Sequence, residues 1–156
     1  MALAQFVKYD QFFLDKSWQW LNDPEIKLLT QTPEFSKEGQ LKWFNSLDGR
    51  TDYKVWGVTY DGIAVGVVGL KFITDHDAEY FGYLSEKEFW GKGIGQMMLD
   101  FSVTQAKIRQ LSKIYLKVAA TNTRAIKAYE RFGFTTQDIN DSGQMVMDLF
   151  LTDDRD

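Results

Sequence analysis

The chain lacks cysteine altogether and has one histidine and two prolines among its 156 residues. The absence of cysteine excludes disulfides, thiolate metal sites and a cysteine nucleophile, which fits a reducing cytoplasm. The histidine, His76, stands between Asp75 and Asp77, and one imidazole in a polar turn is usually solvated rather than a ligand or a base. The composition therefore predicts no metal site.

The chain also lacks an excess of positive charge and a long apolar run. Its formal net charge is −4, whereas proteins that bind the phosphate backbone of nucleic acids carry a basic face. The longest apolar stretch, 63–70, contains glycines and cannot span a bilayer, and residues 1–8 are too short for a secretory signal. We therefore expect a soluble, cytoplasmic protein, monomeric or homodimeric, that binds neither nucleic acid nor membrane.

The length of 156 residues predicts a single domain, 1–156, and hydrophobic periodicity predicts its helices and strands. Strands are expected at 6–9, 53–60, 64–73, 78–85, 114–119, 134–138 and 145–151. Helices are expected over about 10–21, 36–47, 93–112 and 122–132, and 28–35 reads as an irregular segment that contains Pro33. The helix from residue 93 places Ile94, Met97, Met98, Phe101 and Ile108 on one apolar stripe. The order predicts an α/β (α+β) domain whose mixed, mostly antiparallel seven-stranded sheet is flanked by about four helices.

The richest local signal is the segment Trp90-Gly91-Lys92-Gly93-Ile94-Gly95-Gln96, which follows a strand and opens a helix. Glycines allow a tight turn and close approach of a ligand, and the N–H groups of a helix N-terminus bind anions, so this segment predicts a pyrophosphate cradle. Gln96 stands where a dinucleotide fingerprint needs glycine, and the segment has no P-loop lysine followed by serine or threonine. A Rossmann-like nucleotide binder stays an alternative, as does a glycine cluster that only ends a strand.

A second motif follows the strand 114–119. The segment 122–134 reads Asn-x-x-Ala-x-x-x-Tyr-x-x-x-Gly-Phe, from Asn122 through Tyr129 to Phe134. With the glycine segment at this separation, the chain resembles the GNAT superfamily of acetyl-CoA-dependent N-acetyltransferases. The family pattern Gln/Arg-x-x-Gly-x-Gly/Ala has Trp90 at its first position here, which removes one side-chain contact to phosphate and leaves the main-chain cradle intact.

The resemblance implies a single-domain GNAT fold in which the strands 78–85 and 114–119 splay apart around the pantetheine arm of acetyl-CoA. It assigns cofactor binding to backbone groups of Tyr83, Leu84, Ser85, Gly91, Lys92, Gly93, Ile94, Gly95 and Gln96, and to the side-chain amide of Asn122. Asn122 serves equally well as a plain helix N-cap, and the two roles are compatible. Arg124, Lys127 and Arg131 share one helical face, for which a solvated basic surface is favoured over contact with the adenosine phosphates.

Acetyl transfer to an amine requires an ammonium of pKa about 10 to lose a proton and a thiolate of parent pKa about 8.5 to gain one. The resemblance implies Tyr129 as the acid, against a packed core tyrosine. Glu79 is the leading base, through a water, against a cross-strand ion-pair partner. A backbone N–H near Leu84 or Ser85 is the expected oxyanion donor.

The acceptor is the least determined feature. The segment 28–35, with Thr30 and Phe35, is expected to cover the acceptor side. Its surroundings resemble acetyltransferases of surface-glycan pathways, which implies a nucleotide-linked amino sugar. Protein N-terminal amines of the ribosomal-protein type and polyamines are alternatives of the same class, and a noncatalytic acyl-CoA-binding module is an alternative of another class.

Overall fold

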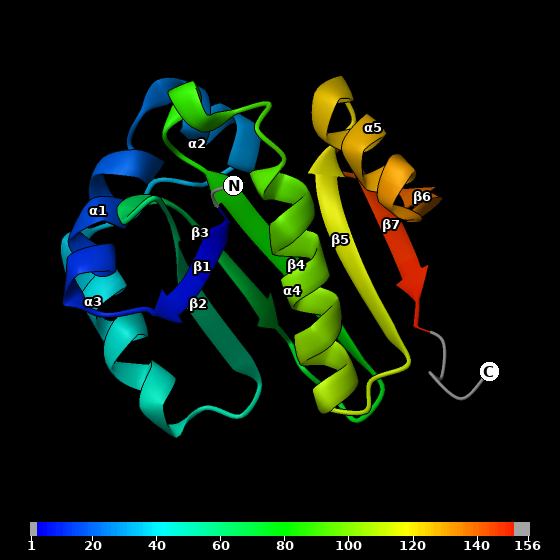
Figure 1. Cartoon of the computed structure of the whole chain (residues 1–156), viewed down its shortest axis with the longest axis horizontal. Coiled ribbons are helices and arrows are strands. Elements are labelled where there is room, and N and C mark those ends of the chain that lie inside the picture. Colours follow the sequence, from blue (N-terminus) through cyan, green and yellow to red (C-terminus); the bar gives the residue numbers. More distant parts are fainter. Residues whose placement is uncertain (1–2, 152–156) are drawn as a thin grey trace.

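One mixed sheet organises the computed structural model, which describes residues 3–151 (Figure 1). Within these residues the sheet has seven strands in the order β1-β2-β3-β4-β5-β7-β6. The strands are β1 Ala4–Lys8, β2 Tyr53–Tyr60, β3 Ile63–Lys71, β4 Asp77–Leu84, β5 Lys113–Ala119, β6 Thr135–Ile139 and β7 Gln144–Phe150. The predicted strand number and mixed pairing are confirmed; residues 1–2 and 152–156 of the expected domain lie outside the described range.

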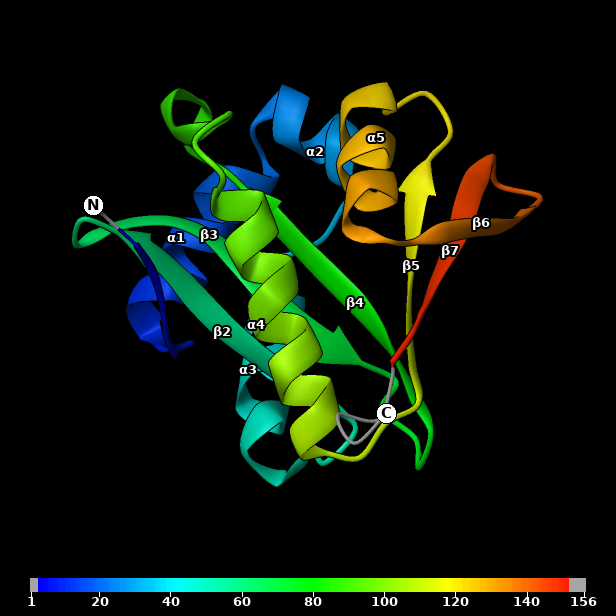
Figure 2. The same cartoon turned by 45° about the vertical axis from the view of Figure 1, so that its right-hand side comes forward.

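Five α-helices surround the sheet in this part of the chain, one more than predicted. They are α1 Gln11–Leu21, α2 Pro24–Thr30, α3 Lys37–Ser46, α4 Ile94–Ile108 and α5 Thr123–Phe132, and two short 3₁₀ turns, η1 Leu47–Gly49 and η2 Lys87–Phe89, complete the set. Figure 2 shows α4 across one face of the sheet and α1 and α3 on the other. Among residues 3–151 no helix is both long enough and apolar enough to cross a bilayer.

The additional helix is α2, whose last three residues, 28–30, lie in the segment expected to be irregular. Asp23 caps it, because its Oδ1 accepts hydrogen bonds from the N–H groups of Glu25 at 2.9 Å and Ile26 at 3.3 Å. Pro24 is the first helical residue, where its missing N–H costs nothing. The segment around this proline therefore separates α1 from α2 and begins the second helix.

Two cores hold the layers together. The larger core lies between the sheet and α4 and includes Val68, Leu70, Ile94, Met98 and Ile114. The smaller core packs Tyr9, Phe13, Leu14 and Trp20 against Val67 on the opposite face. The predicted α4 stripe is correct near its start and wrong at Ile108, which ends the helix with 67% of its surface exposed.

The parallel pair β4 and β5 separates along its length. Asp77, Ala78 and Glu79 pair with Lys113, Ile114 and Tyr115, and the pairing ends there. Beyond Glu79 the two strands diverge toward the end of the sheet where α2 and α5 lie (Figure 1). The predicted splay is therefore present, and it opens the sheet between its two helical layers.

Candidate functional site

The glycine loop forms a bare helix N-terminus beside the splay. Gly91 and Gly93 have φ angles of 82° and 83°, in the left-handed region that favours glycine. Gly93 is the N-cap of α4, and no side chain among the described residues caps this 15-residue helix. The first N–H groups of a helix have no intrahelical partner, so those at Ile94, Gly95 and Gln96 are available to an anion.

The Trp90 side chain connects the glycine loop to the end of β4. Its indole Nε1 donates a hydrogen bond to the Leu84 carbonyl at 2.9 Å, which ties the loop to the end of β4. The guanidinium of Arg124 lies 5.4 Å from the Trp90 ring centroid, and its Nη2 is 3.6 Å from where a Gly91 Cβ would stand. Arg124 is exposed, in keeping with the favoured solvated basic face, and its guanidinium lies beside the loop.

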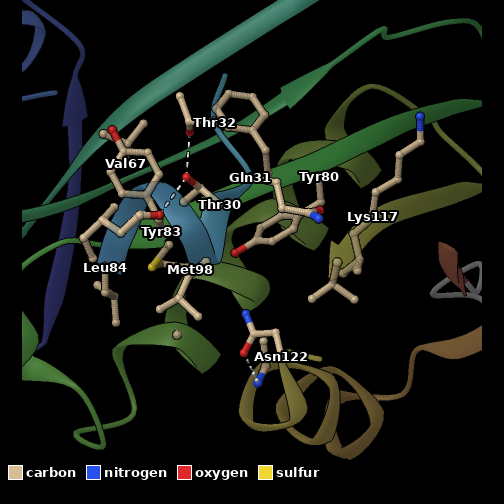
Figure 3. A pocket seen from close by; sticks show the side chains of 18 of the residues that line it. Thr30, Gln31, Thr32, Val67, Tyr80, Tyr83, Leu84, Met98, Lys117 and Asn122 are labelled. Carbon is tan, nitrogen blue, oxygen red and sulfur yellow. Dashed lines mark hydrogen bonds between the residues drawn. The ribbon is translucent and has the colours of Figure 1, made fainter. Parts of the chain in front are cut away.

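Helix α5 presents Asn122 and Tyr129 to the splay. The Asn122 Oδ1 accepts a hydrogen bond from the Ala125 N–H at 3.3 Å, so Asn122 is the N-cap, and its amide nitrogen points toward the cavity (Figure 3). The Tyr129 ring packs edge to face on Tyr80, with centroids 6.3 Å apart. Burial raises the pKa of the Tyr129 hydroxyl to about 12, so this group is neutral at physiological pH.

The end of β4 offers fewer backbone groups than expected. The Ser85 N–H donates to the Val65 carbonyl at 2.8 Å, and the Ser85 hydroxyl donates to the same oxygen at 3.0 Å. Because hydrogen-bonded pairs alternate in an antiparallel ladder, Tyr83 opposite Val67 also directs its backbone toward β3. Of the three residues expected to contact pantetheine, Leu84 directs its backbone toward the splay. The Ser85 N–H is not the oxyanion donor, because it is already bonded to the Val65 carbonyl.

Glu79 lies where the splay begins, on the face opposite α4. Its side chain is 9% exposed, its Oε2 is 3.8 Å from the Lys71 ammonium, and its Oε1 is 3.9 Å from the Lys117 ammonium. Lys71 is also its register partner in β3. Glu79 is therefore a cross-strand ion-pair partner and, at the same time, a carboxylate at the edge of the cavity.

A cavity of about 930 Å³ joins these parts. Figure 3 shows Asn122 at one end and Thr30, Gln31 and Thr32 at the other, with Tyr80 between them. Most residues predicted for the site line it, namely Glu79, Tyr83, Leu84, Gly91, Gly93, Gly95, Gln96, Asn122 and Tyr129, with Thr30 and Phe35 at the acceptor end. Lys92, Ile94 and Ser85 lie outside its lining, and Ile94 is buried in the core.

Helix α2 bridges the mouth of the splay. At its start, the Lys87 ammonium contacts Asp23 Oδ1 at 3.3 Å and Glu25 Oε1 at 3.0 Å, and Lys87 follows β4. At its end, Gln144 Nε2 donates to Gln31 Oε1 at 2.6 Å, and Gln144 begins β7, the partner of β5. The helix is thereby attached to both sides of the gap and covers the acceptor end.

Sequence reasoning missed a hydroxyl cluster and the lysines at the acceptor end. The hydroxyls of Tyr9 and Tyr83 donate to Ser17 Oγ at 2.7 Å and 3.3 Å. Lys71 and Lys117 flank Glu79 because of strand register, which joins residues far apart in sequence. Alternation along each strand indicates which face a residue occupies, but it gives no signal for register.

The strands β4 and β5 separate beside a glycine loop at the N-terminus of α4. This arrangement is typical of a protein that binds an extended, phosphate-bearing cofactor between two strands of its sheet. Residues 14–134 match the model of the acetyltransferase (GNAT) family. A probable spermine N(1)-acetyltransferase of Bacillus subtilis subsp. natto is 29% identical over 104 residues, 61% of this chain and 68% of that protein.

Solved structures share the fold over nearly the whole chain. Spermidine N-acetyltransferase from Vibrio cholerae, in complex with CoA and spermine, has a TM-score of 0.84 and 22% identity, covering 95% of each chain. Campylobacter jejuni N-acetyltransferase PseH, in complex with acetyl coenzyme A, has a TM-score of 0.74 and 18% identity, covering 96% of this chain and 100% of that one.

The chain therefore belongs to the acetyltransferase (GNAT) family. It is an N-acetyltransferase, and family membership identifies acetyl-CoA as its cosubstrate, as the two sequence motifs predicted.

Proposed function

We propose that this enzyme moves the acetyl group of acetyl-CoA to the primary amine of a nucleotide-linked amino sugar. One observation carries the proposal: a single cavity runs from the glycine loop and Tyr129, through the splay, to Glu79 and the aromatic acceptor end. A cofactor aligned along the splay and an amine on the opposite face can therefore meet inside the sheet. The aromatic lining of the acceptor end, including Phe35 and Trp43, suits stacking on a base or a sugar.

The cofactor end of the cavity fits coenzyme A. The N–H groups at the start of α4 suit the diphosphate, and Arg124 adds a cation beside them. The Asn122 amide nitrogen and the backbone of Leu84 line the path that the pantetheine arm needs. When bound, acetyl-CoA supplies the activated thioester.

The residues of the splay provide the proton transfers. As the amine nitrogen bonds to the thioester carbonyl carbon, the carbon–sulfur bond breaks and Tyr129 donates its proton to the departing sulfur. The Leu84 N–H stabilises negative charge on the carbonyl oxygen. Glu79 takes the ammonium proton through a water, and this role is compatible with its ion pairs because each lysine lies beyond direct hydrogen-bond distance.

Polyamines are the second candidate acceptors, because the matching Bacillus subtilis relative is a probable spermine acetyltransferase. A screen tests both classes: thiol release from acetyl-CoA is measured with nucleotide-linked amino sugars, peptides with unmodified N-termini, and polyamines. We expect the amino sugars to give the highest kcat/KM. Efficient turnover of polyamines or peptides alone would refute the amino-sugar assignment.

Tyr129→Phe tests the assigned acid. We expect kcat to fall by about 10²-fold, because phenylalanine cannot protonate the sulfur, while affinity for acetyl-CoA by calorimetry stays close to that of the wild type. Tyr60→Phe is the matched control, since this tyrosine is outside the cavity lining. Binding of acetyl-CoA without acetylation of any amine by the wild type would favour a noncatalytic acyl-CoA-binding module.

A further inference from the structure

The acceptor end of the cavity has more positively than negatively charged side chains. Five charged side chains line the whole cavity in the described chain: Lys71, Glu79, Lys117, Arg124 and Arg131. The two arginines belong to α5, at the cofactor end. The acceptor end therefore holds two lysines and one glutamate, a net charge of +1, and Glu79 is its single carboxylate among residues 3–151.

The aromatic rings at this end do not compensate for the missing carboxylates. Aromatic faces attract cations, but protein cations already occupy several of them. The Lys71 ammonium lies 5.5 Å from the ring centroids of both Phe72 and Phe81. The guanidinium of Arg50 lies 4.9 Å from the centroid of Tyr53. A polyamine would therefore bring several positive charges into a site that is already positive.

We infer that the acceptor carries an anionic group, a carboxylate or a phosphate, in addition to its amine, and that Lys71 and Lys117 bind this group. The inference rests on the proposed function and narrows its acceptor class to amines of zero or negative net charge. A nucleotide-linked amino sugar meets the condition, and a polyamine does not. Glu79 faces the amine, and the flanking lysines face the anion.

The geometry leaves both lysines able to make this contact. Their ammonium groups lie 3.8 Å and 3.9 Å from the Glu79 oxygens, so each is held near the carboxylate without a close hydrogen bond. Each ammonium has three donors, which allows a second anionic partner. Lys71 is 29% exposed, and the Phe81 and Phe72 rings confine its head group to the cavity edge.

Matched pairs of amines test the inference on the whole protein. One pair is glucosamine 6-phosphate and glucosamine, which differ in a phosphate. The other pair is phenylalanine and phenylalaninamide, which differ in a carboxylate. Spermidine represents the polycationic amines. Thiol release gives kcat/KM for each amine, and calorimetry gives its affinity for the CoA-loaded protein. We expect the anionic member of at least one pair to exceed its partner by about tenfold in affinity, and spermidine to be the weakest.

The double variant Lys71→Met with Lys117→Met removes the proposed anion site, and Lys71→Arg retains its charge. Lys113→Met is the matched control, because Lys113 is 28% exposed and lies 3.7 Å from Asp148, much as Lys71 lies from Glu79, yet it is outside the cavity lining. We expect the double variant to lose the preference for the anionic amine, with Lys71→Arg and the control retaining it.

Equal affinity for both members of each pair, tighter binding of spermidine, or an unchanged preference in the double variant would overturn the inference. These outcomes are distinct from failure of the proposed function. If the wild type acetylated no amine, the proposed function would fail, whereas the calorimetric preference would still decide the charge of the ligand at this end.

Discussion

Arg124 places a positive charge beside the loop position at which Trp90 replaces the polar residue of the family pattern. Trp90 occupies the position where the family pattern has glutamine or arginine, so a polar side chain is lost from the loop. The Trp90 ring instead carries the Arg124 guanidinium, whose Nη2 reaches the edge of Gly91. A cation on an aromatic face is worth about 0.5–1 kcal/mol where exposed, which is enough to bias the arginine toward the loop.

We predict that Arg124→Ala weakens acetyl-CoA binding by about tenfold, because one charge-assisted contact to the cofactor phosphates is lost. Calorimetry with acetyl-CoA at fixed salt measures the change. Lys127→Ala is the control: it removes a positive charge from the same helix, but Lys127 is exposed and outside the cavity lining. An equal loss of affinity in both variants would mean that Arg124 acts only through the general field of α5.

Helix α4 begins at a residue with a left-handed backbone conformation, Gly93. Gly93 has a φ of 83° as N-cap, and Gly95 lies inside the first helical turn. A Cβ at either position would be more than 4 Å from the surrounding described atoms, so neither substitution creates a clash. The two glycines therefore differ in backbone conformation and not in available space.

We predict opposite effects on stability from alanine at these two positions. Gly93→Ala should lower the free energy of unfolding by about 1–2 kcal/mol, the cost of an L-residue in the left-handed region. Gly95→Ala should raise it by about 0.5–1 kcal/mol, because alanine loses less backbone entropy in a helix. Urea unfolding of both variants measures the difference, and the same sign for both would contradict this account of the loop.

Elements with a strong period or a clear cap could be predicted from the sequence. The strand 53–60 has the predicted bounds. Ser36, the first residue of the predicted helix 36–47, caps α3 by accepting from the Gly39 N–H at 3.0 Å. Asp61 and Gly62, which separate the predicted strands 53–60 and 64–73, form a turn with φ angles of 52° and 77°. Helix α2 was missed because its seven residues are too few for a periodic signal and because proline both ends and begins helices.

The site was predictable where it follows a local motif and unpredictable where it depends on pairing. The glycine loop and Asn122 are read from contiguous residues. The Lys71 and Lys117 ion pairs with Glu79 require the β3–β4 register and the packing of β5, which are set by the cores and not by any residue near them in sequence. The same limit applies to the Ser85 N–H, whose direction follows from the phase of the ladder.

Across the whole molecule, tyrosine hydroxyls gather around the cavity that joins the two layers. Burial is the main cause of a raised pKa in five that line it: Tyr9, Tyr53, Tyr80, Tyr83 and Tyr129. Each is neutral in the folded protein over a wider pH range than in the unfolded chain. Unfolding at high pH therefore releases protons from these groups, so the free energy of unfolding decreases as the pH rises into the alkaline range.

Tyr129 is the simplest of these groups to test, because burial alone raises its pKa from 10.0 to about 12. A raised folded-state pKa gives stability that is complete below the unfolded value and is lost as the pH rises from about 10 through the folded value. For this one group the free energy of unfolding falls by about 1.3 kcal/mol between about pH 9 and pH 11. Other ionisable groups contribute to the pH dependence of stability in the same interval, so the comparison must be made between the wild type and Tyr129→Phe.

Urea unfolding of both proteins at these two pH values provides that comparison. The wild type should lose more stability than the variant by about 1.3 kcal/mol, because phenylalanine has no proton to release and the groups that do not interact with Tyr129 contribute equally to both proteins. Parallel losses would show that the Tyr129 hydroxyl reaches solvent in the folded protein and titrates near its ordinary pKa. The hydroxyl would then not be desolvated, and the burial of Tyr129 between α5 and the sheet would not raise its pKa.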